Sequence, residues 1–184
     1  MDSEYMELTE LEKEVLVKLA KEGPLSGYDL HLGGRRKRGT REALMSSSHW
    51  IEVQKKLLNE GLIRLCGTRN EKYRGRGRHL YFLTEHGAIA SMSYGANIDL
   101  LERNLEYFKD KEEQDAVKVW IDECKTLGAE RIRAIYEILT LKKPSDVQLS
   151  LDEAKEILKT LFEHPKWGST FKSAVKMLKD ILGE

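Results

Sequence analysis

The segment from Leu58 to Gly87 constrains the fold of this chain more than any other part of its sequence. Short aliphatic runs over 62–65 and 80–83 have the length and composition of strands. Between them, over 74–78, arginine alternates with glycine, which suits the tip of a tight hairpin. An amphipathic helix ends just before the first strand, and Thr84 has the character of a helix start. The segment therefore predicts helix, strand, basic hairpin, strand and helix in succession.

Two helices are predicted ahead of this segment. Thr9 and Glu12 match a capping box, in which the threonine oxygen accepts from a free backbone N–H and the glutamate reaches back. Apolar residues then recur at helical spacing until the Gly-Pro pair at 23–24, which ends a helix. Ser26 is placed to cap a short second helix that extends through residue 32.

A third helix is predicted from about Ser48 to Glu60. At about 100° per residue its apolar side chains gather on one side, which we expect to be buried. That side consists of Trp50, Val53 and Leu57, flanked by Ile51 and Leu58. The opposite side consists of Ser48, Glu52, Lys55, Lys56 and Asn59. Gln54 falls among the apolar positions, a local conflict that the pattern does not resolve.

The sequence from about residue 94 onward predicts helices throughout. We expect them over 97–108, 112–127, 129–141 and 151–163, with a last helix that begins near Pro165 and runs to about residue 182. A boundary near 93–97 divides the chain into two predicted domains, residues 1–93 and 94–184. The predicted fold class is mainly α with a small β-hairpin.

The charge of the chain is unevenly distributed. Lys and Arg number 31 and Asp and Glu number 31, so the formal net charge is zero. Between His31 and Leu80, however, thirteen basic residues face four acidic ones, which leaves this stretch at +9 and the remainder at −9. Such a division is typical of a basic module that binds polyanions, joined to an acidic, solvated body.

Composition excludes several classes of protein. Hydrophobic residues make up 40% of the chain and charged residues 34%, as in helix-rich soluble proteins. No run approaches the ~20 apolar residues of a membrane-spanning helix. The first ten residues are acidic and lack the apolar core of a signal peptide. Two distant cysteines, Cys66 and Cys124, are typical of free thiols in a reducing compartment, so we expect a cytoplasmic protein.

Three pieces of the first half of the chain carry a family resemblance. Residues 15–30 look like a first helix, a Gly-Pro-Leu turn and a Gly-Tyr-acidic start of the next helix. Residues 53–63 look like the end of a recognition helix with a Gly-Leu-Ile exit, and 76–87 like a wing followed by Leu-Thr-Glu-x-Gly. In this order they resemble PadR-like and, more broadly, MarR-like transcriptional regulators. The chain departs from the usual Gly-Thr-Leu-Tyr-like start of the recognition helix, with Ser-Ser-Ser-His-Trp at 46–50.

The resemblance implies a winged helix-turn-helix that binds double-stranded DNA and regulates transcription, followed by a C-terminal helical domain. In such a module the third helix offers its N-terminal residues to base edges in the major groove. The recognition-helix candidates are Ser46, Ser48, His49, Glu52, Lys55 and Lys56. For the serines, helix capping is an alternative role, and for Glu52 an ion pair with a neighbouring lysine.

Basic loops add candidates for the DNA backbone, because Lys and Arg that neutralise phosphates release condensed counterions. The wing candidates are Lys72, Arg74, Arg76 and Arg78, whose guanidinium groups suit phosphates or a narrow minor groove. A second basic loop contributes Arg35, Arg36, Lys37, Arg38 and Arg41. The alternatives are a solvated hairpin tip for the wing and a disordered segment for the other loop.

Other functions receive less support from the residues. The five histidines form no cluster with metal-ligand spacing, and the Gly-x-Gly at 75–77 does not open a helix, so we expect neither an enzyme nor a cofactor. The runner-up is a protein-interaction module or a non-specific architectural nucleic-acid-binding protein. RNA binding is a third possibility, with Tyr73 and Tyr81 near the wing as its support.

The C-terminal helices carry apolar faces that need a partner. Two-fold dimers are common among DNA-binding proteins because each subunit then reads one half-site. We therefore expect a homodimer formed through the C-terminal helices, with the faces closing on themselves as the alternative. A small-molecule effector near Trp120 or Trp167 is a further idea without direct support in the sequence.

Overall fold

The computed structural model describes residues 8–31, 45–69 and 77–141, together with 150, 152, 155, 156 and 159. These residues form mostly helices with one small antiparallel sheet. In chain order the elements are α1 (Glu10–Glu22), β1 (Leu25–Ser26), α2 (Gly27–His31), α3 (Ser47–Asn59), β2 (Ile63–Arg69), β3 (Arg78–Leu83), α4 (Glu85–Ser93), α5 (Ile98–Arg103), the 3-10 turn η1 (Leu105–Tyr107), α6 (Lys111–Leu127) and α7 (Ala129–Leu141).

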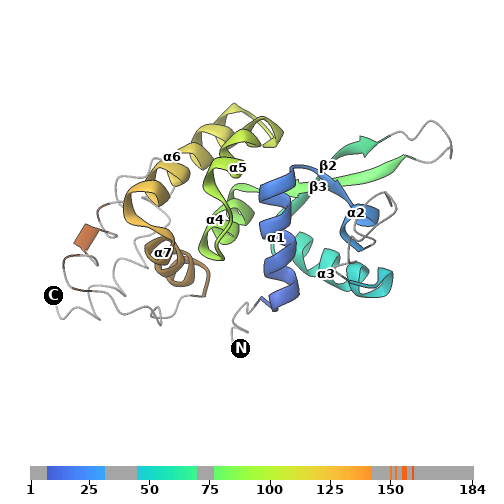
Figure 1. Ribbon diagram of the computed structural model, residues 1–184, viewed down its shortest axis with the longest axis horizontal. Helices are drawn as coiled ribbons and strands as arrows, with labels where there is room; N and C mark the ends of the chain where they lie inside the picture. The colour runs from blue at the N-terminus through green and yellow to red at the C-terminus, as the bar shows by residue number, and fades with distance from the viewer. Residues whose placement is uncertain are drawn as a thin grey trace.

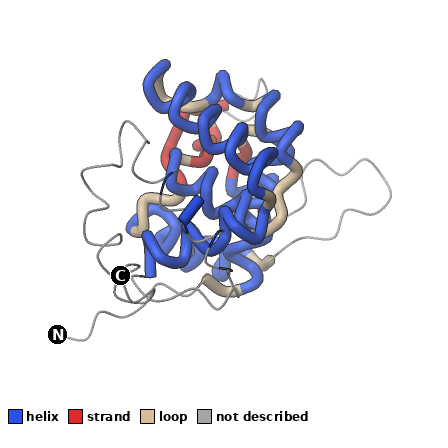
Figure 2. Tube along the Cα trace, turned by 90° about the vertical axis from the view of Figure 1, so that its left-hand side faces the viewer, coloured by secondary structure: helices blue, strands red, loops and turns tan. Residues whose placement is uncertain are grey.

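Helix α1 lies in the middle of the molecule, with α2, α3 and the β2–β3 hairpin toward one end and α6 and α7 toward the other (Figure 1). Viewed from the α6–α7 end, helices lie in front of the strands (Figure 2). No helix among the described residues is long and apolar enough to cross a membrane.

The predicted start and stop of the first helix are confirmed. The Thr9 hydroxyl accepts from the backbone N–H of Glu12 at 3.3 Å, and the Thr9 N–H donates to the Glu12 carboxylate at 2.8 Å. This reciprocal pair satisfies two backbone donors that the first turn leaves open. Helix α1 ends at Glu22 because Gly23 adopts φ 81°, a left-handed conformation that glycine reaches without strain.

Helix α3 begins at Ser47, one residue before its predicted start, because the Ser46 hydroxyl accepts from the His49 N–H at 3.3 Å. The predicted core positions Trp50, Val53 and Leu57 are all buried. The prediction is wrong for Ile51. It was expected to flank the buried side of the helix, but 52% of its surface is exposed. At about 100° per residue it lies roughly 130° around the helix from the centre of the buried side.

The sheet contains one strand more than predicted. Its order is β1-β3-β2, with β3 in the middle and both pairings antiparallel. The β2–β3 ladder runs from Ile63↔Leu83 to Arg69↔Arg78, interrupted by an irregularity between Leu65 and Gly67. Strand β1 follows the Gly-Pro turn. It has two residues, which are too few to give a periodic signal in the sequence. The hairpin strands are longer than the predicted 62–65 and 80–83 because backbone pairing continues into the polar residues.

Helix α4 joins the two ends of the molecule. Its cap is Thr84, as predicted, with the hydroxyl accepting from the Gly87 N–H at 3.0 Å. Almost all of α4 is buried, because α1 packs on one side of it and α6 and α7 on the other. A single cluster of buried apolar residues therefore continues across the predicted boundary at 93–97. The division into two domains stays a prediction.

The predicted helix over 97–108 is divided in the structure into α5 and η1. Asn97 caps α5, and the chain turns at Asn104, whose side-chain amide donates to the carbonyl oxygen of Ala20 in α1 at 2.9 Å. This tertiary bond attaches the α5–η1 turn to α1. Helices α6 and α7 are separated by Gly128 with φ 89°, as predicted. The predicted helices over 151–163 and to residue 182 lie outside the continuously described residues.

Candidate nucleic-acid interface

The solvent-facing side of α3 is formed by exposed residues from the start of the helix to its end. It consists of Ser47, Ser48, His49, Ile51, Glu52, Lys55 and Asn59. The predicted candidates Ser48, His49, Glu52 and Lys55 thus lie together on one accessible surface. Ser46 precedes them as the helix cap, and its hydroxyl lies 3.1 Å from that of Ser48. The capping role that the sequence left open is therefore confirmed for Ser46.

Lys55 and Lys56 are neighbours in sequence with different surroundings. The ammonium of Lys56 lies 2.9 Å from the carboxylate of Glu12, a side chain only 6% exposed. Lys56 thereby joins α3 to α1, and a phosphate would have to compete with a nearly buried carboxylate for it. Lys55 is exposed, and among the described residues no ion pair is recorded for it. Of the two, Lys55 is the better candidate for a contact with DNA.

The inner side of α3 packs against α2 and the hairpin. The Trp50 ring meets the Tyr81 ring of β3 edge-on, with 5.7 Å between centroids and 72° between planes. The Gln54 amide donates to the Tyr81 hydroxyl at 2.7 Å, which explains why a polar residue stands among the apolar positions of this helix. A Cβ at Gly27, the first residue of α2, would overlap the Trp50 indole nitrogen. These contacts fix the direction of α3 relative to the hairpin.

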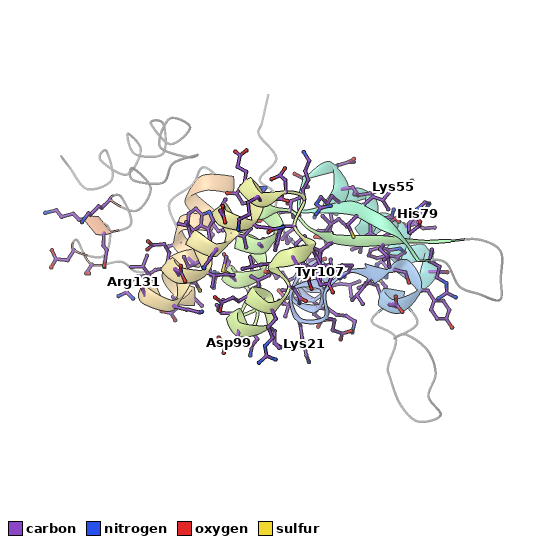
Figure 3. All side chains as sticks on the ribbon, turned by 90° about the horizontal axis from the view of Figure 1, so that it is seen from above. Lys21, Lys55, His79, Asp99, Tyr107 and Arg131 are labelled. Carbon is purple, nitrogen blue, oxygen red and sulfur yellow. The ribbon has the colours of Figure 1, made fainter. Side chains whose placement is uncertain are left out.

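The loop end of the described hairpin carries a basic side chain in a defined position. The guanidinium of Arg78 lies 3.9 Å from the centroid of the Tyr28 ring of α2, at cation–π distance. Its neighbour His79 is exposed and was not among the sequence candidates. Figure 3 labels Lys55 and His79 at one end of the long axis, with Arg131 toward the other end.

The remaining sequence candidates lie outside the described residues. These are the wing-tip residues Lys72, Arg74 and Arg76 and the loop residues Arg35, Arg36, Lys37, Arg38 and Arg41. The described surface therefore contains part of the predicted basic region. In that part, Arg78 represents the hairpin and Lys55 the third helix.

Arg64 contributes to the positive charge of the hairpin in the sequence but is directed toward the C-terminal helices. Its guanidinium donates to the backbone carbonyl of Tyr107 at 2.6 Å and lies 3.9 Å from the Glu113 carboxylate. The same carboxylate accepts from the backbone N–H groups of Glu85 and Lys109 at 3.0 and 2.7 Å. Glu113 therefore connects β2, α4 and α6, a role that spans distant parts of the sequence and that no local pattern signals.

Other candidate sites have different properties. A cleft of about 640 Å³ lies beside α1, the end of α4 and α7. It contains the ion pairs Lys13–Glu10 and Lys18–Glu22, at 2.6 and 2.7 Å, so these four charged groups already have partners. Trp120, one of the two tryptophans considered for an effector, is fully buried in the core, and Trp167 lies outside the described residues. Among the described residues no group of three or more His, Cys, Asp or Glu side chains gathers to hold a metal.

The two cysteines are free thiols, as predicted. Burial raises the pKa of the Cys66 thiol, with the nearby Arg64 opposing this effect, and burial likewise raises the pKa of Cys124. A thiol with a raised pKa is protonated at neutral pH and is a weak nucleophile. Neither thiol has the properties of an activated catalytic cysteine.

No protein-family model, no curated protein and no solved structure matches this chain. The likeness to PadR-like regulators therefore rests on the motifs in the sequence. What the described residues contribute independently is the geometry of α3 and the hairpin.

Proposed function

We propose that this chain is a sequence-specific, double-stranded-DNA-binding transcriptional regulator with a winged helix-turn-helix. In this proposal α3 is the recognition helix in the major groove, and the β2–β3 hairpin is the wing on the adjacent backbone or minor groove. One observation carries the proposal: α3 is held by Trp50 and Gln54 on its inner side and leaves a continuous polar surface on its outer side.

The dimensions and chemistry of α3 support this role. An α-helix with its side chains is about 10–12 Å across, which fits the major groove of about 12 Å. The outer surface carries hydroxyl, imidazole, carboxylate and ammonium groups on Ser48, His49, Glu52 and Lys55. These groups donate to and accept from base edges, and an ammonium also neutralises phosphate.

The wing supplies the second point of attachment in the proposal. Tyr28 holds the Arg78 guanidinium at the loop end of strand β3, and Arg74 and Arg76 precede it in the sequence of the connecting loop. Charges in this position add salt-dependent affinity and set the orientation on the duplex without reading sequence. The alternating glycines permit close approach to a groove.

The proposed partner beyond DNA is a second copy of the chain. In a homodimer formed through the C-terminal helices, two copies of α3 would bind the two half-sites of a pseudo-palindromic operator, which are about one helical turn apart. Sedimentation of the purified chain tests this part directly. A monomer at micromolar concentration would remove the dimer from the proposal while leaving the DNA contact to be tested separately.

The test of the DNA contact is fluorescence-anisotropy binding of the full chain to a random 30-base-pair duplex and to duplex selected by the protein from a randomised library, across a salt series. Steep salt dependence with clearly tighter binding to the selected duplex is expected. Equal affinities would favour a non-specific architectural protein. Failure to bind either duplex at low salt would overturn the DNA proposal and favour a protein-interaction module.

Two lysine variants make this test specific to the proposed surface. Lys55→Ala is expected to weaken binding and to reduce the slope of log K against log salt by about one, since one phosphate contact is lost. Lys21→Ala is the matched control. Lys21 is an exposed lysine of α1 and lies apart from Lys55 (Figure 3). Equal losses for the two variants would contradict the placement of α3 on the DNA.

A further inference from the structure

Ile51 is a large apolar side chain on an otherwise polar recognition surface. It is the fifth residue of α3, and 52% of it is exposed, although its neighbours on the same surface are Ser48, Glu52 and Lys55. Single exposed apolar residues are ordinary on protein surfaces and need no explanation by themselves. The position of Ile51 makes it different, because it lies within the surface that the proposed function places against DNA.

Its place on α3 is defined by two neighbours. Lys55 follows one helical turn later on the same side, where side chains at i and i+4 lie about 5–6 Å apart. Gln54, whose amide reaches Tyr81, marks the side of α3 that faces β3. At about 100° per residue Ile51 lies between these two directions, on the hairpin side of the exposed surface. It is also in the N-terminal half of the helix, the part that reaches base edges in a helix-turn-helix.

The major groove contains one apolar group that such a side chain can contact. The base edges present N7, O6, O4 and exocyclic amino groups, all polar, and the C5-methyl of thymine. An isoleucine placed against polar edges removes water from them without offering a hydrogen bond, which is unfavourable. Placed against a thymine methyl, it buries apolar surface on both sides. The geometry of α3 therefore favours an A·T pair opposite Ile51.

We infer that Ile51 is a specificity-determining residue that packs against the C5-methyl of a thymine in the operator, next to the base or phosphate bound by Lys55. This inference rests on the proposed function and adds a base identity to it. Burial of one methyl group contributes about fourfold in affinity, which sets the size of the expected effect.

The experiment removes the methyl from either partner. The duplex selected by the full-length chain is prepared with each thymidine in turn replaced by deoxyuridine, which keeps the base pair and deletes the methyl. At one thymidine per half-site the wild-type chain is expected to lose about fourfold in affinity by anisotropy. Ile51→Ala is expected to bind the parent duplex about as weakly and to lose nothing further at that position.

A matched control uses another exposed apolar residue. Val119 of α6 is 39% exposed and far along the chain from α3, so Val119→Ala is expected to keep the wild-type response to deoxyuridine. Because Ile51 lies outside the buried side of α3, both variants are expected to fold, and circular dichroism checks this.

The outcomes separate the two proposals. A library that yields no preferred duplex overturns the proposed function and this inference with it. A preferred duplex in which Ile51→Ala and the wild type respond alike at every deoxyuridine overturns the inference alone. Loss of the methyl response in Ile51→Ala but not in Val119→Ala supports it.

Discussion

The side-chain amide of Gln54 in α3 donates a 2.7 Å hydrogen bond to the hydroxyl of Tyr81 in the middle strand of the sheet. The same tyrosine ring makes a T-shaped contact with Trp50, one turn earlier in α3. One residue of β3 thus contacts two successive turns of the proposed recognition helix. This relationship couples the direction of α3 to the hairpin, so the two proposed DNA-contacting elements are held as one unit.

Tyr81→Phe is expected to lower the free energy of unfolding by about 1 kcal/mol at pH 7, because the Gln54 amide loses its partner. The difference from wild type should shrink as pH rises above about 10. Burial raises the pKa of Tyr81 above its ordinary value of 10.0, so the unfolded chain loses this proton first and the wild type is destabilised, while phenylalanine has no proton to lose. Urea unfolding of both proteins from pH 8 to 11 measures this. A gap that widens with pH would contradict the burial of the hydroxyl.

The pair Lys55 and Lys56 is expected to separate DNA binding from stability. Lys56→Met should lower the free energy of unfolding by about 1–3 kcal/mol, because the nearly buried Glu12 carboxylate loses its ion-pair partner. Lys55→Met should change stability by about 0.5 kcal/mol or less and should weaken DNA binding instead. Chemical denaturation and anisotropy of each variant test the division. If Lys56→Met were as stable as the wild type, the ion pair would have no structural role.

Gly87→Ala is expected to destabilise the protein by about 3 kcal/mol or more, because a methyl there would overlap the backbone carbonyl oxygen of Leu62, which cannot move without the strand. Gly67→Ala in β2 is the control, since a Cβ at that position has no heavy atom within 4 Å. Its expected change is within about 0.5 kcal/mol. Thermal unfolding followed by circular dichroism compares them. Similar melting temperatures for the two variants would mean that α4 does not approach Leu62 this closely.

His86 is expected to make the protein less stable in mild acid. Burial lowers the pKa of His86 from its ordinary value of 6.5, with Glu85 opposing this effect, so the unfolded chain takes up the proton first as pH falls. Stability from this group is therefore present above pH 6.5 and is lost below it. The free energy of unfolding of His86→Phe should depend less on pH between 7.5 and 5 than that of the wild type. NMR titration of the His86 ring gives the pKa directly, and a value above 6.5 would contradict the prediction.

Local sequence signals predicted much of the fold because their causes are local. The capping box of Thr9 and Glu12, the caps at Thr84 and Ser46 and the turn at Gly23 each involve atoms within a few residues of one another. The buried stripe of Trp50, Val53 and Leu57 follows from helical periodicity alone. The two hairpin strands were predicted from their short aliphatic runs, which are also local signals. Their full length was not predicted.

The sequence by itself determined the two ends of α1, the start of α4, the hairpin and the concentration of positive charge, since these depend on composition and short-range spacing. Only the tertiary structure decided which side chains are bonded within the protein and which are left exposed to solvent. It assigns Lys56 to Glu12 across 44 positions, Gln54 to Tyr81 across 27 and Arg64 to Tyr107 across 43, and it leaves Ile51 exposed. The physical reason is that hydrogen bonds, ion pairs and burial depend on distances between elements, and the packing of α1, α3 and the sheet sets those distances.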